Sequence, residues 1–325
     1  MNRSSFVRTV AHASLLAALA PLSAPLFAQA FPQGPVTLVC PYGPGTGIDV
    51  IARIIGQKLG ESWGYAVVVK NQPGGSGNIG AMAAANSKAD GSTMLIVANS
   101  HFINQNVSRN VVNLSKAFDP VAPAGTVPYV VTVTSSLPVN SLSELVAYAK
   151  SKPGEVNYSG IFGSVPHLLG VALKTAGNID IRFISYKSTT DATVDAISGR
   201  VPIWFTTLAS ALPLIQSGQI RPLAVTGDKR APRLPAVPTV AEAGFPTLDL
   251  GAAFFFMAPA GTPGSIIDKM NRDITSAMNN KEVIDRLAEQ GAQPTTSSPA
   301  ALGELMKNES AKWSEVVKLS GISVE

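Results

Sequence analysis

The stretch Pro35–Ile48, PVTLVCPYGPGTGI, indicates how this chain folds. Its first six residues are rich in Val, Leu and Thr, which is typical of a buried strand, and the glycines and prolines that follow mark a turn. From Ile48 to Gly60 the apolar residues recur at helical spacing. A strand, a tight turn and a helix in this order form the first part of a βαβ unit, whose second strand runs parallel to the first.

The same alternation continues along the chain and predicts an α/β fold with two open, mostly parallel sheets flanked by helices. Ser141 followed by Glu144 forms a capping box at the start of one helix. Strands are expected at 35–40, 65–70, 93–98, 127–133, 156–159, 182–185, 201–205 and 223–226, with a further apolar run at 254–258, and helices at 48–60, 78–87, 141–151, 165–175, 189–198, 263–279, 281–290 and 299–319.

Three proline-rich stretches interrupt this alternation: Asp119–Pro128, Ala231–Pro238 and Met257–Pro263. We expect the first and the third to be crossovers between two lobes, because proline-rich segments with few contacts connect compact units. Residues 31–125 would then form the first part of lobe 1, residues 126–249 lobe 2, and residues 250–325, with the C-terminal helices, the second part of lobe 1.

The amino-acid composition and net charge exclude two classes of protein. With 46% hydrophobic and 14% charged residues among 325, the chain is not a disordered one. The formal charge is +4, but the first 30 residues hold Arg3 and Arg8 and no acid, so the rest has 23 basic and 21 acidic residues, a net charge of +2. That charge is too small, and too evenly spread, to predict a nucleic-acid partner.

Residues 1–30 resemble a secretory signal peptide. Arg3 and Arg8 give the positive n-region, Ala13–Ala20 the apolar h-region, and Ala28-Gln29-Ala30 a cleavage site before Phe31. A membrane anchor is the alternative, but the apolar run is shorter than the roughly 20 residues that a span requires. We therefore expect a cleaved, secreted protein.

A set of short motifs runs in order through the chain. They are Pro41–Asp49 (PYGPGTGID), Val68–Gly80 (VVKNQPGGSGNIG), Asp90–Leu95, Ala147–Lys150, Lys152–Gly154, His167–Leu168, Tyr186–Thr189, Ala224–Thr226 and Pro238–Gly244. Together they resemble the Bug family, the extracytoplasmic solute receptors of tripartite tricarboxylate transporters. The resemblance implies a periplasmic receptor of the Venus-flytrap type, two-lobed and monomeric, that binds a small organic acid between its lobes and meets membrane transporter subunits transiently.

The first candidate binding loop is Tyr42–Gly47, which lies between the expected strand at 35–40 and the expected helix at 48–60. Ligands of open α/β sheets bind beyond the carboxyl ends of strands, where helix N-termini offer N–H groups and partial positive charge. An ordinary βα turn is the alternative. Asp49, in the first helical turn, is expected to cap the helix or fix the loop, because it would repel an anionic solute. The candidate ligand-binding residues of this loop are Tyr42, Gly43, Gly45, Thr46 and Gly47.

The second candidate loop, Gly160–His167, also lies between an expected strand and a helix, and the resemblance implies that it faces the first loop across a cleft. Its candidate residues are Phe162, Gly163, Ser164 and His167. His167 has a structural hydrogen-bonding role as its alternative.

Two further positions follow strands. Ser100 and His101 come after the strand at 93–98, in what we expect to be a loop lining the cleft, and an ordinary surface loop is the alternative. Thr206 follows the strand at 201–205, where the resemblance implies Asp in many members; a neutral residue argues against a ligand with an amino group. Trp204 either forms an apolar wall or points into the core. No arginine is placed to clamp a carboxylate, so backbone amides, hydroxyls and water are the expected donors.

Several other classes of protein lack support. The G-x-S-x-G turn of a serine hydrolase is absent, and only His101 and His167 follow the signal segment. No metal-ligand spacing and no nucleotide-binding glycine motif occur, so we expect no cofactor and no metal. Cys40 is expected to be buried in a strand without a disulfide. A secreted hydrolytic enzyme and a receptor used only for sensing remain the alternatives.

Overall fold

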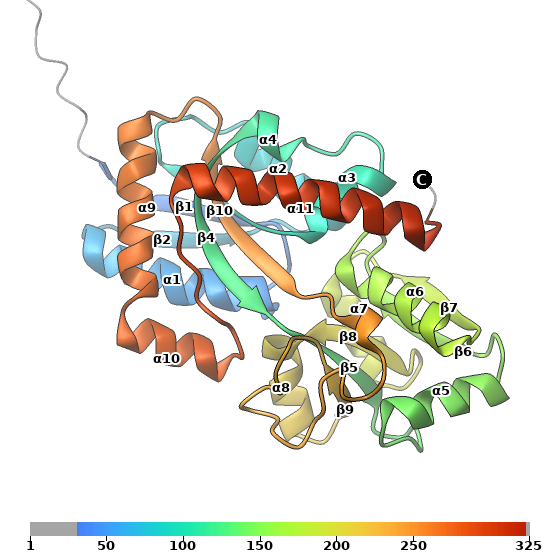
Figure 1. Cartoon of the computed structure of the whole chain (residues 1–325). Helices are drawn as coiled ribbons and strands as arrows, with labels where there is room; N and C mark the ends of the chain where they lie inside the picture. Colours follow the sequence, from blue (N-terminus) through green and yellow to red (C-terminus); the bar gives the residue numbers. More distant parts are fainter. Residues whose placement is uncertain (1–30, 323–325) are drawn as a thin grey trace, which may run out of the picture. The chain divides into compact units, whose positions relative to one another are not determined.

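The computed structural model describes residues 31–322, which form two lobes, each built on a five-stranded sheet flanked by helices (Figure 1). No helix in this range is long and apolar enough to cross a membrane. The first sheet has the order β2-β1-β3-β10-β4. Its elements are β1 Val36–Cys40, α1 Gly47–Trp63, β2 Val67–Asn71, the 3₁₀ turn η1 Gly75–Gly77, α2 Asn78–Ala85, β3 Thr93–Ala98, α3 Ser100–Val107, α4 Leu114–Ala117, β4 Phe118–Val127, β10 Ala252–Pro259, α9 Gly264–Met278, α10 Lys281–Glu289 and α11 Pro299–Ser320.

The second sheet has the order β7-β6-β8-β5-β9. Its elements are β5 Tyr129–Thr134, α5 Leu142–Ser151, β6 Val156–Gly160, α6 Val165–Gly177, β7 Ile181–Ser185, α7 Thr189–Ile197, β8 Ile203–Thr207, α8 Leu208–Gln216 and β9 Ile220–Val225, followed by the 3₁₀ turn η2 Pro246–Leu248.

Each sheet is mixed, with a single reversed strand. In the first sheet β10 is antiparallel to both β3 and β4, and in the second β5 is antiparallel to both β8 and β9. The other four strands of each sheet run in the same direction. In this respect the sheets agree with the expectation of mostly parallel strands. The reversed strands are those that follow the passages between the sheets: β5 comes after β4 and the single residue Pro128, and β10 comes after β9 and residues 226–251.

The proline-rich stretch Asp119–Pro128 is a strand rather than the expected linker. It forms most of β4, the edge strand of the first sheet, and pairs with β10 along its length. Pro120 and Pro123 lie beside the two register shifts of this pairing. An edge strand with bulges accepts proline because the missing N–H is not required by a second neighbour. The passage between the sheets therefore lies at Pro128. The stretch Met257–Pro263 is not a crossover either, because its first three residues end β10 and the chain returns to the first sheet through residues 226–251.

One helix of the second lobe packs directly on an aromatic ring. Gly170 lies in the middle of α6, where glycine is unfavourable by up to about 1 kcal/mol relative to alanine. A methyl group at this position would overlap the ring of Tyr158 on β6, which in turn packs against Phe183 and Phe205. Gly170 therefore sets the distance between α6 and the sheet.

We predict that Gly170→Ala lowers the free energy of unfolding by about 1–3 kcal/mol, because the overpacked ring outweighs the gain in helix propensity. Gly303 provides a matched control, since it also lies inside a helix but its added methyl group would be 3.6 Å from the nearest atom. Gly303→Ala should stabilise by about 0.4–1 kcal/mol. Urea unfolding of both variants checks this, and equal effects of the two substitutions would contradict it.

Candidate functional site

A cleft lies where the two lobes face each other, and its cavity volume is about 80 Å³, room for several water-sized groups. Apolar walls alternate with hydroxyl groups, and no Asp, Glu, Lys, Arg or His is among the lining residues. The lining residues are Tyr42, Thr46, Gly47, Ile48, Ala98, Ser100, Tyr129, Gly160, Ile161, Ser164, Pro166, Thr189, Ala192, Trp204, Phe205, Thr206, Thr207, Ser210 and Phe254.

Five helices begin at this cleft: α1 and α3 from the first lobe and α6, α7 and α8 from the second. Each follows a strand of its sheet that ends at the cleft, so the helix N-termini of both lobes converge. An N-terminus carries about half a positive charge and several N–H groups without intrahelical partners. The cleft thus offers positive potential and hydrogen-bond donors without a charged side chain.

The N-cap residues of α1 and α6 carry hydroxyl groups, but these hydroxyls do not cap the first turns of their helices. Thr46 and Ser164 occupy these positions, but neither side chain accepts a bond from its own helix. Instead Thr46 Oγ1 donates to the Gly43 carbonyl at 2.8 Å and Ser164 Oγ donates to the Ile161 carbonyl at 2.6 Å. The N–H groups of these turns are therefore not taken up by a cap.

The N-terminus of α8 follows the same pattern, because Thr207 at its N-cap contacts Ser210 Oγ at 3.1 Å rather than the backbone. The helices that begin away from the cleft are of two kinds. Asn113, Ser141, Asn280 and Ser298 cap α4, α5, α10 and α11 with the usual side-chain bonds, whereas α2 and α9 have no side-chain cap. Among the helices at the cleft, α7 is the exception, since Ser188 caps it.

The two candidate loops share one local turn. Gly45 has φ 77° and Gly163 has φ 68°, and each precedes the hydroxyl residue that bonds back to a carbonyl three positions earlier. The same turn occurs before α9, where Thr262 Oγ1 donates to the Pro259 carbonyl at 2.6 Å, outside the cleft. The turn is therefore a way to begin a helix, and the placement of two such turns across one cleft is what distinguishes the site.

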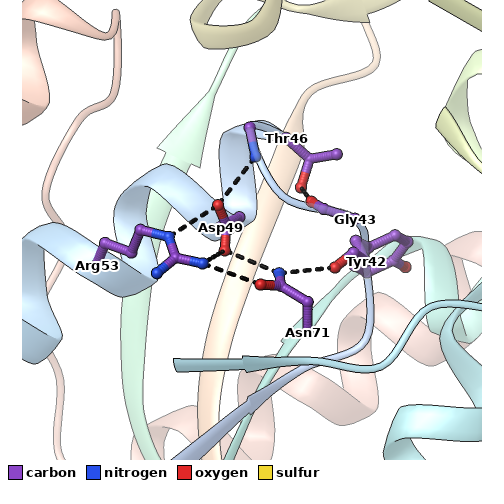
Figure 2. Close-up of polar contacts among 7 residues, drawn as sticks. Tyr42, Gly43, Thr46, Asp49, Arg53 and Asn71 are labelled. Carbon is purple, nitrogen blue, oxygen red and sulfur yellow. Dashed lines mark hydrogen bonds and ion pairs between the residues drawn. The ribbon is translucent and has the colours of Figure 1, made fainter. Parts of the chain in front are cut away.

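Asp49 holds the first loop in place, as Figure 2 shows. Its carboxylate accepts hydrogen bonds from Gly45 N at 2.9 Å, from Asn71 Nδ2 at 2.8 Å and from Arg53 Nε and Nη2 at 3.0 and 2.9 Å. Burial alone would raise the pKa of Asp49, but the bonds from Arg53, Asn71 and Gly45 outweigh it and lower the pKa. Asp49 is thus an ionised, paired group that fixes the loop.

Asn71 is a loop-fixing residue that the sequence did not reveal. Its Nδ2 also donates to the carbonyl of Tyr42 at 2.9 Å, and its Oδ1 accepts from Arg53 Nη2 at 2.9 Å (Figure 2). Asn71 ends β2, so the neighbouring strand supports the loop that follows β1. The motif Val68–Gly80 contained it, but no local pattern connected it to residues 42–53.

His167 lies behind the cleft instead of in its wall. Its ring stacks on Phe183 at a centroid distance of 3.9 Å, and it is 6% exposed. Its Nδ1 accepts a hydrogen bond from Gly163 N at 3.4 Å. Burial lowers the pKa of His167 to about 4, so the ring is neutral near pH 7 and can act as this acceptor. Of its two expected roles, the geometry is that of the structural one.

The segment Ser100–Phe102 begins helix α3 and is not the expected loop. Ser100 lines the cleft, whereas His101 is fully buried, with Nε2 2.9 Å from the carbonyl oxygen of Val112. Consecutive residues of a helix point in different directions, so only one of the two can face the cleft. Burial lowers the pKa of His101, which keeps it neutral.

The structure brings half of the predicted ligand-binding residues to the cleft wall. Those in the wall are Tyr42, Thr46, Gly47, Ser100, Ser164 and Thr206. Those outside it are Gly43, Gly45, His101, Phe162, Gly163 and His167. Trp204, for which the sequence left two orientations open, lines the cleft.

Tyr129 and Phe254 are wall residues that the sequence did not indicate. They lie on β5 and β10, the strands that follow the two passages between the lobes, so both belong to the part of the cleft nearest the connections. No local signal marks them, because their position depends on the pairing of strands that are distant in sequence.

Glycines permit the close approach of the two lobes. A Cβ atom on Gly47 would lie 2.6 Å from Thr207 Oγ1, and one on Gly163 would lie 2.6 Å from Val107 Cγ2. Gly291, between α10 and α11, likewise has no room for a side chain beside Leu208. A side chain at any of these positions would collide with the opposite lobe.

We predict that Gly47→Ala weakens solute binding by about tenfold or more, because the added methyl group keeps the lobes apart at Thr207. Gly47 does not have a positive φ, so alanine fits its backbone and each lobe should stay folded. The double variant Gly47→Ala with Thr207→Ala should recover part of the affinity. Calorimetric titration with a solute that the wild type binds measures all three proteins, and unchanged binding by Gly47→Ala would contradict the prediction.

The burial of His167 predicts acid sensitivity. Its pKa is about 4 in the folded state and about 6.5 when unfolded, so the unfolded chain binds more protons between these values. Stability should therefore fall as the pH drops from 6.5 to 4, by up to about 3 kcal/mol from this residue. His167→Asn keeps an acceptor for Gly163 N without titrating, and it should flatten this part of the pH profile in urea unfolding. The buried His101 should retain its own contribution, and an unchanged profile would contradict the assignment to His167.

Comparison with known proteins places this geometry in a family. Residues 51–322 match the family described as "Tripartite tricarboxylate transporter family receptor". Protein BugT of Bordetella pertussis is 34% identical over 325 residues, covering 99% of this chain and 100% of the relative.

Two solved structures share the fold across nearly the whole chain. One, Rpa4515 of R. palustris with adipate, is 36% identical, has a TM-score of 0.88, and covers 91% of this chain and 100% of its own. The other, MatC of Rhodopseudomonas palustris with bound malate, is 27% identical, has a TM-score of 0.81, and covers 88% of this chain and 100% of its own. The chain is a member of the family of tripartite tricarboxylate transporter receptors, which are solute-binding proteins with a two-lobed α/β fold.

Proposed function

We propose that this receptor closes its lobes on a small organic acid that has no amino group, in the periplasm, and delivers it to a tripartite tricarboxylate-type transporter. The observation that carries the proposal is the convergence of helix N-termini on a cleft without charged side chains. A carboxylate in this cleft is stabilised by N–H groups, hydroxyls and the dipoles of α1, α6 and α8. The adipate and malate bound in the two solved structures of relatives support an acid as ligand.

The neutral walls of the cleft disfavour a ligand that carries an ammonium group. An ammonium group buried in the cleft would need a carboxylate or several acceptors, since an unpaired buried charge is strongly unfavourable. Thr206, 3% exposed at the end of β8, offers only a hydroxyl where an acidic side chain would be required. Amino acids are therefore expected to bind poorly.

The apolar side chains favour an acid with a hydrocarbon segment. Ile48, Trp204, Phe205 and Phe254 supply apolar surface to the cleft. Each methylene that the ligand buries against them contributes about 0.8 kcal/mol. A dicarboxylate whose carboxyl groups are separated by methylenes would satisfy both the donors and these walls.

The proposed function also requires export of the receptor to the periplasm and delivery of the solute to the transporter. Residues 1–30 would direct the chain to the periplasm and be removed before Phe31, so that N-terminal sequencing of the exported protein would begin there. Closure buries the solute and gives the transporter a form of the receptor that differs from the empty one. The same closure would serve a receptor used for sensing, which a transport defect in a deletion strain would distinguish.

A thermal-shift screen of the protein from Phe31 onward tests the ligand class with pairs of solutes that differ by one amino group: succinate against aspartate, and glutarate against glutamate. We expect the acids without amino groups to raise the melting temperature, since binding adds about 2.7 kcal/mol at 100 times the dissociation constant. The paired amino acids should have little effect.

The variant Thr206→Asp is the matched control for this screen. Its carboxylate should weaken dicarboxylate binding by repulsion and favour the amino acid of each pair. Equal shifts by succinate and aspartate in the wild type would contradict the exclusion of amino groups, and shifts produced only by neutral solutes would contradict acid binding.

A further inference from the structure

The loop between β2 and α2 has an unusual backbone. Gly74, Gly75, Ser76 and Gly77 have φ values of 126°, 54°, 52° and 92°, so four consecutive residues lie in the positive-φ region. Glycine adopts this region freely, but for serine the left-handed conformation is unfavourable by roughly 1–2 kcal/mol. Such strain persists only where surrounding structure supports it, and it is concentrated at functional positions.

The side chain of Ser76 explains why a serine occupies this position. Its Oγ donates to the carbonyl oxygen of Phe162 at 2.6 Å. Ser76 belongs to the first lobe, and Phe162 lies in the loop before α6 of the second. Two further hydrogen bonds between the lobes, Val165 N to Ser100 Oγ and Ser210 Oγ to the Gly45 carbonyl, are both 3.5 Å. The Ser76 bond is the shortest of the three.

Both partners of this bond are supported from behind. Asn104 of α3 donates from Nδ2 to the Gly75 carbonyl at 3.0 Å, which holds the strained loop. On the other side, Gly163 packs against α3 and its N–H donates to His167 Nδ1. The loop at 161–164 is therefore held between α3, the ring of His167 and the hydroxyl of Ser76.

This loop supplies the cleft wall, but Ser76 does not. Ile161 and Ser164 line the cleft, and Ser76 lines only a smaller adjoining hollow. We propose that Ser76 is a positioning residue: its hydroxyl fastens the 161–164 loop to the first lobe when the lobes meet, and so slows the escape of the solute. The proposal rests on the proposed function for the identity of the solute, while the bond itself joins two parts of the protein.

Three variants separate this role from a merely structural one. Ser76→Ala removes the hydroxyl and keeps the strained backbone, whereas Ser76→Gly removes the hydroxyl and relieves the strain. Asn178→Gly is the control, because Asn178 at the end of α6 also has a positive φ, 46°, is exposed, and takes part in none of the three hydrogen bonds between the lobes named above. Glycine should stabilise the unliganded protein at both positions.

Two measurements test whether the hydrogen bond from Ser76 to Phe162 positions the loop. Stopped-flow dissociation with adipate as the probe should be roughly three- to tenfold faster for Ser76→Ala and Ser76→Gly, and unchanged for Asn178→Gly. Hydrogen–deuterium exchange without ligand should accelerate in the peptide covering 160–168 for both Ser76 variants and not for Asn178→Gly.

The outcomes distinguish the two proposals. If adipate and the acids of the screen fail to bind the wild type, the proposed function is wrong, and the exchange measurement still decides the role of Ser76. If Ser76→Gly stabilises the protein but leaves both dissociation and exchange at wild-type values, Ser76 does not position the loop, and the proposed function is unaffected.

Discussion

The carboxyl ends of the parallel strands in both sheets open on one cleft, and the rest of the site depends on this constraint. Five of the helices that follow such strands begin at the cleft, α1 and α3 on one side and α6, α7 and α8 on the other, with their N-termini directed inward. The peptide dipoles then supply the positive potential that ionic side chains supply elsewhere. Because these donors are backbone groups, the site needs no arginine, and the charged residues near it, such as Asp49 and Arg53, are paired with each other to support a loop.

A neutral cleft has a further physical consequence. Burying an ion pair carries a large desolvation penalty, whereas N–H groups and hydroxyls in a preformed arrangement lose less hydration when a carboxylate replaces water. The turns at Gly45 and Gly163 contribute to this arrangement by directing the hydroxyls of Thr46 and Ser164 to loop carbonyls. Under the proposed function, discrimination between solutes would depend on which groups the walls cannot satisfy, and an ammonium group is the clearest of these.

Much of this organisation could be predicted from the sequence because its signals are local. Glycine and hydroxyl residues between an apolar run and an amphipathic segment identify a strand, a turn and a helix, and both loops at the cleft were found in this way. The direction of a side chain is not a local property: His101 and His167 belong to the segments predicted as binding loops, yet packing turns both into the protein interior. Tyr129 and Phe254 could not be predicted, because the strands that carry them reach the cleft through pairings across the whole chain. The prolines of β4 suggested a linker because an edge strand with bulges has no distinct composition.

The reversed strand β10 also has a consequence for the order of assembly. It lies between β3 and β4 in the first sheet, but it is synthesised after the whole of the second sheet, whose last strand ends at Val225. Until residue 259 is available, β3, whose residues from Met94 to Ala98 are all buried in the finished protein, has an unpaired edge. Unpaired apolar edges promote association between chains. The second lobe can therefore complete its sheet from a continuous stretch of chain, while the first lobe depends on the arrival of a late strand at its centre.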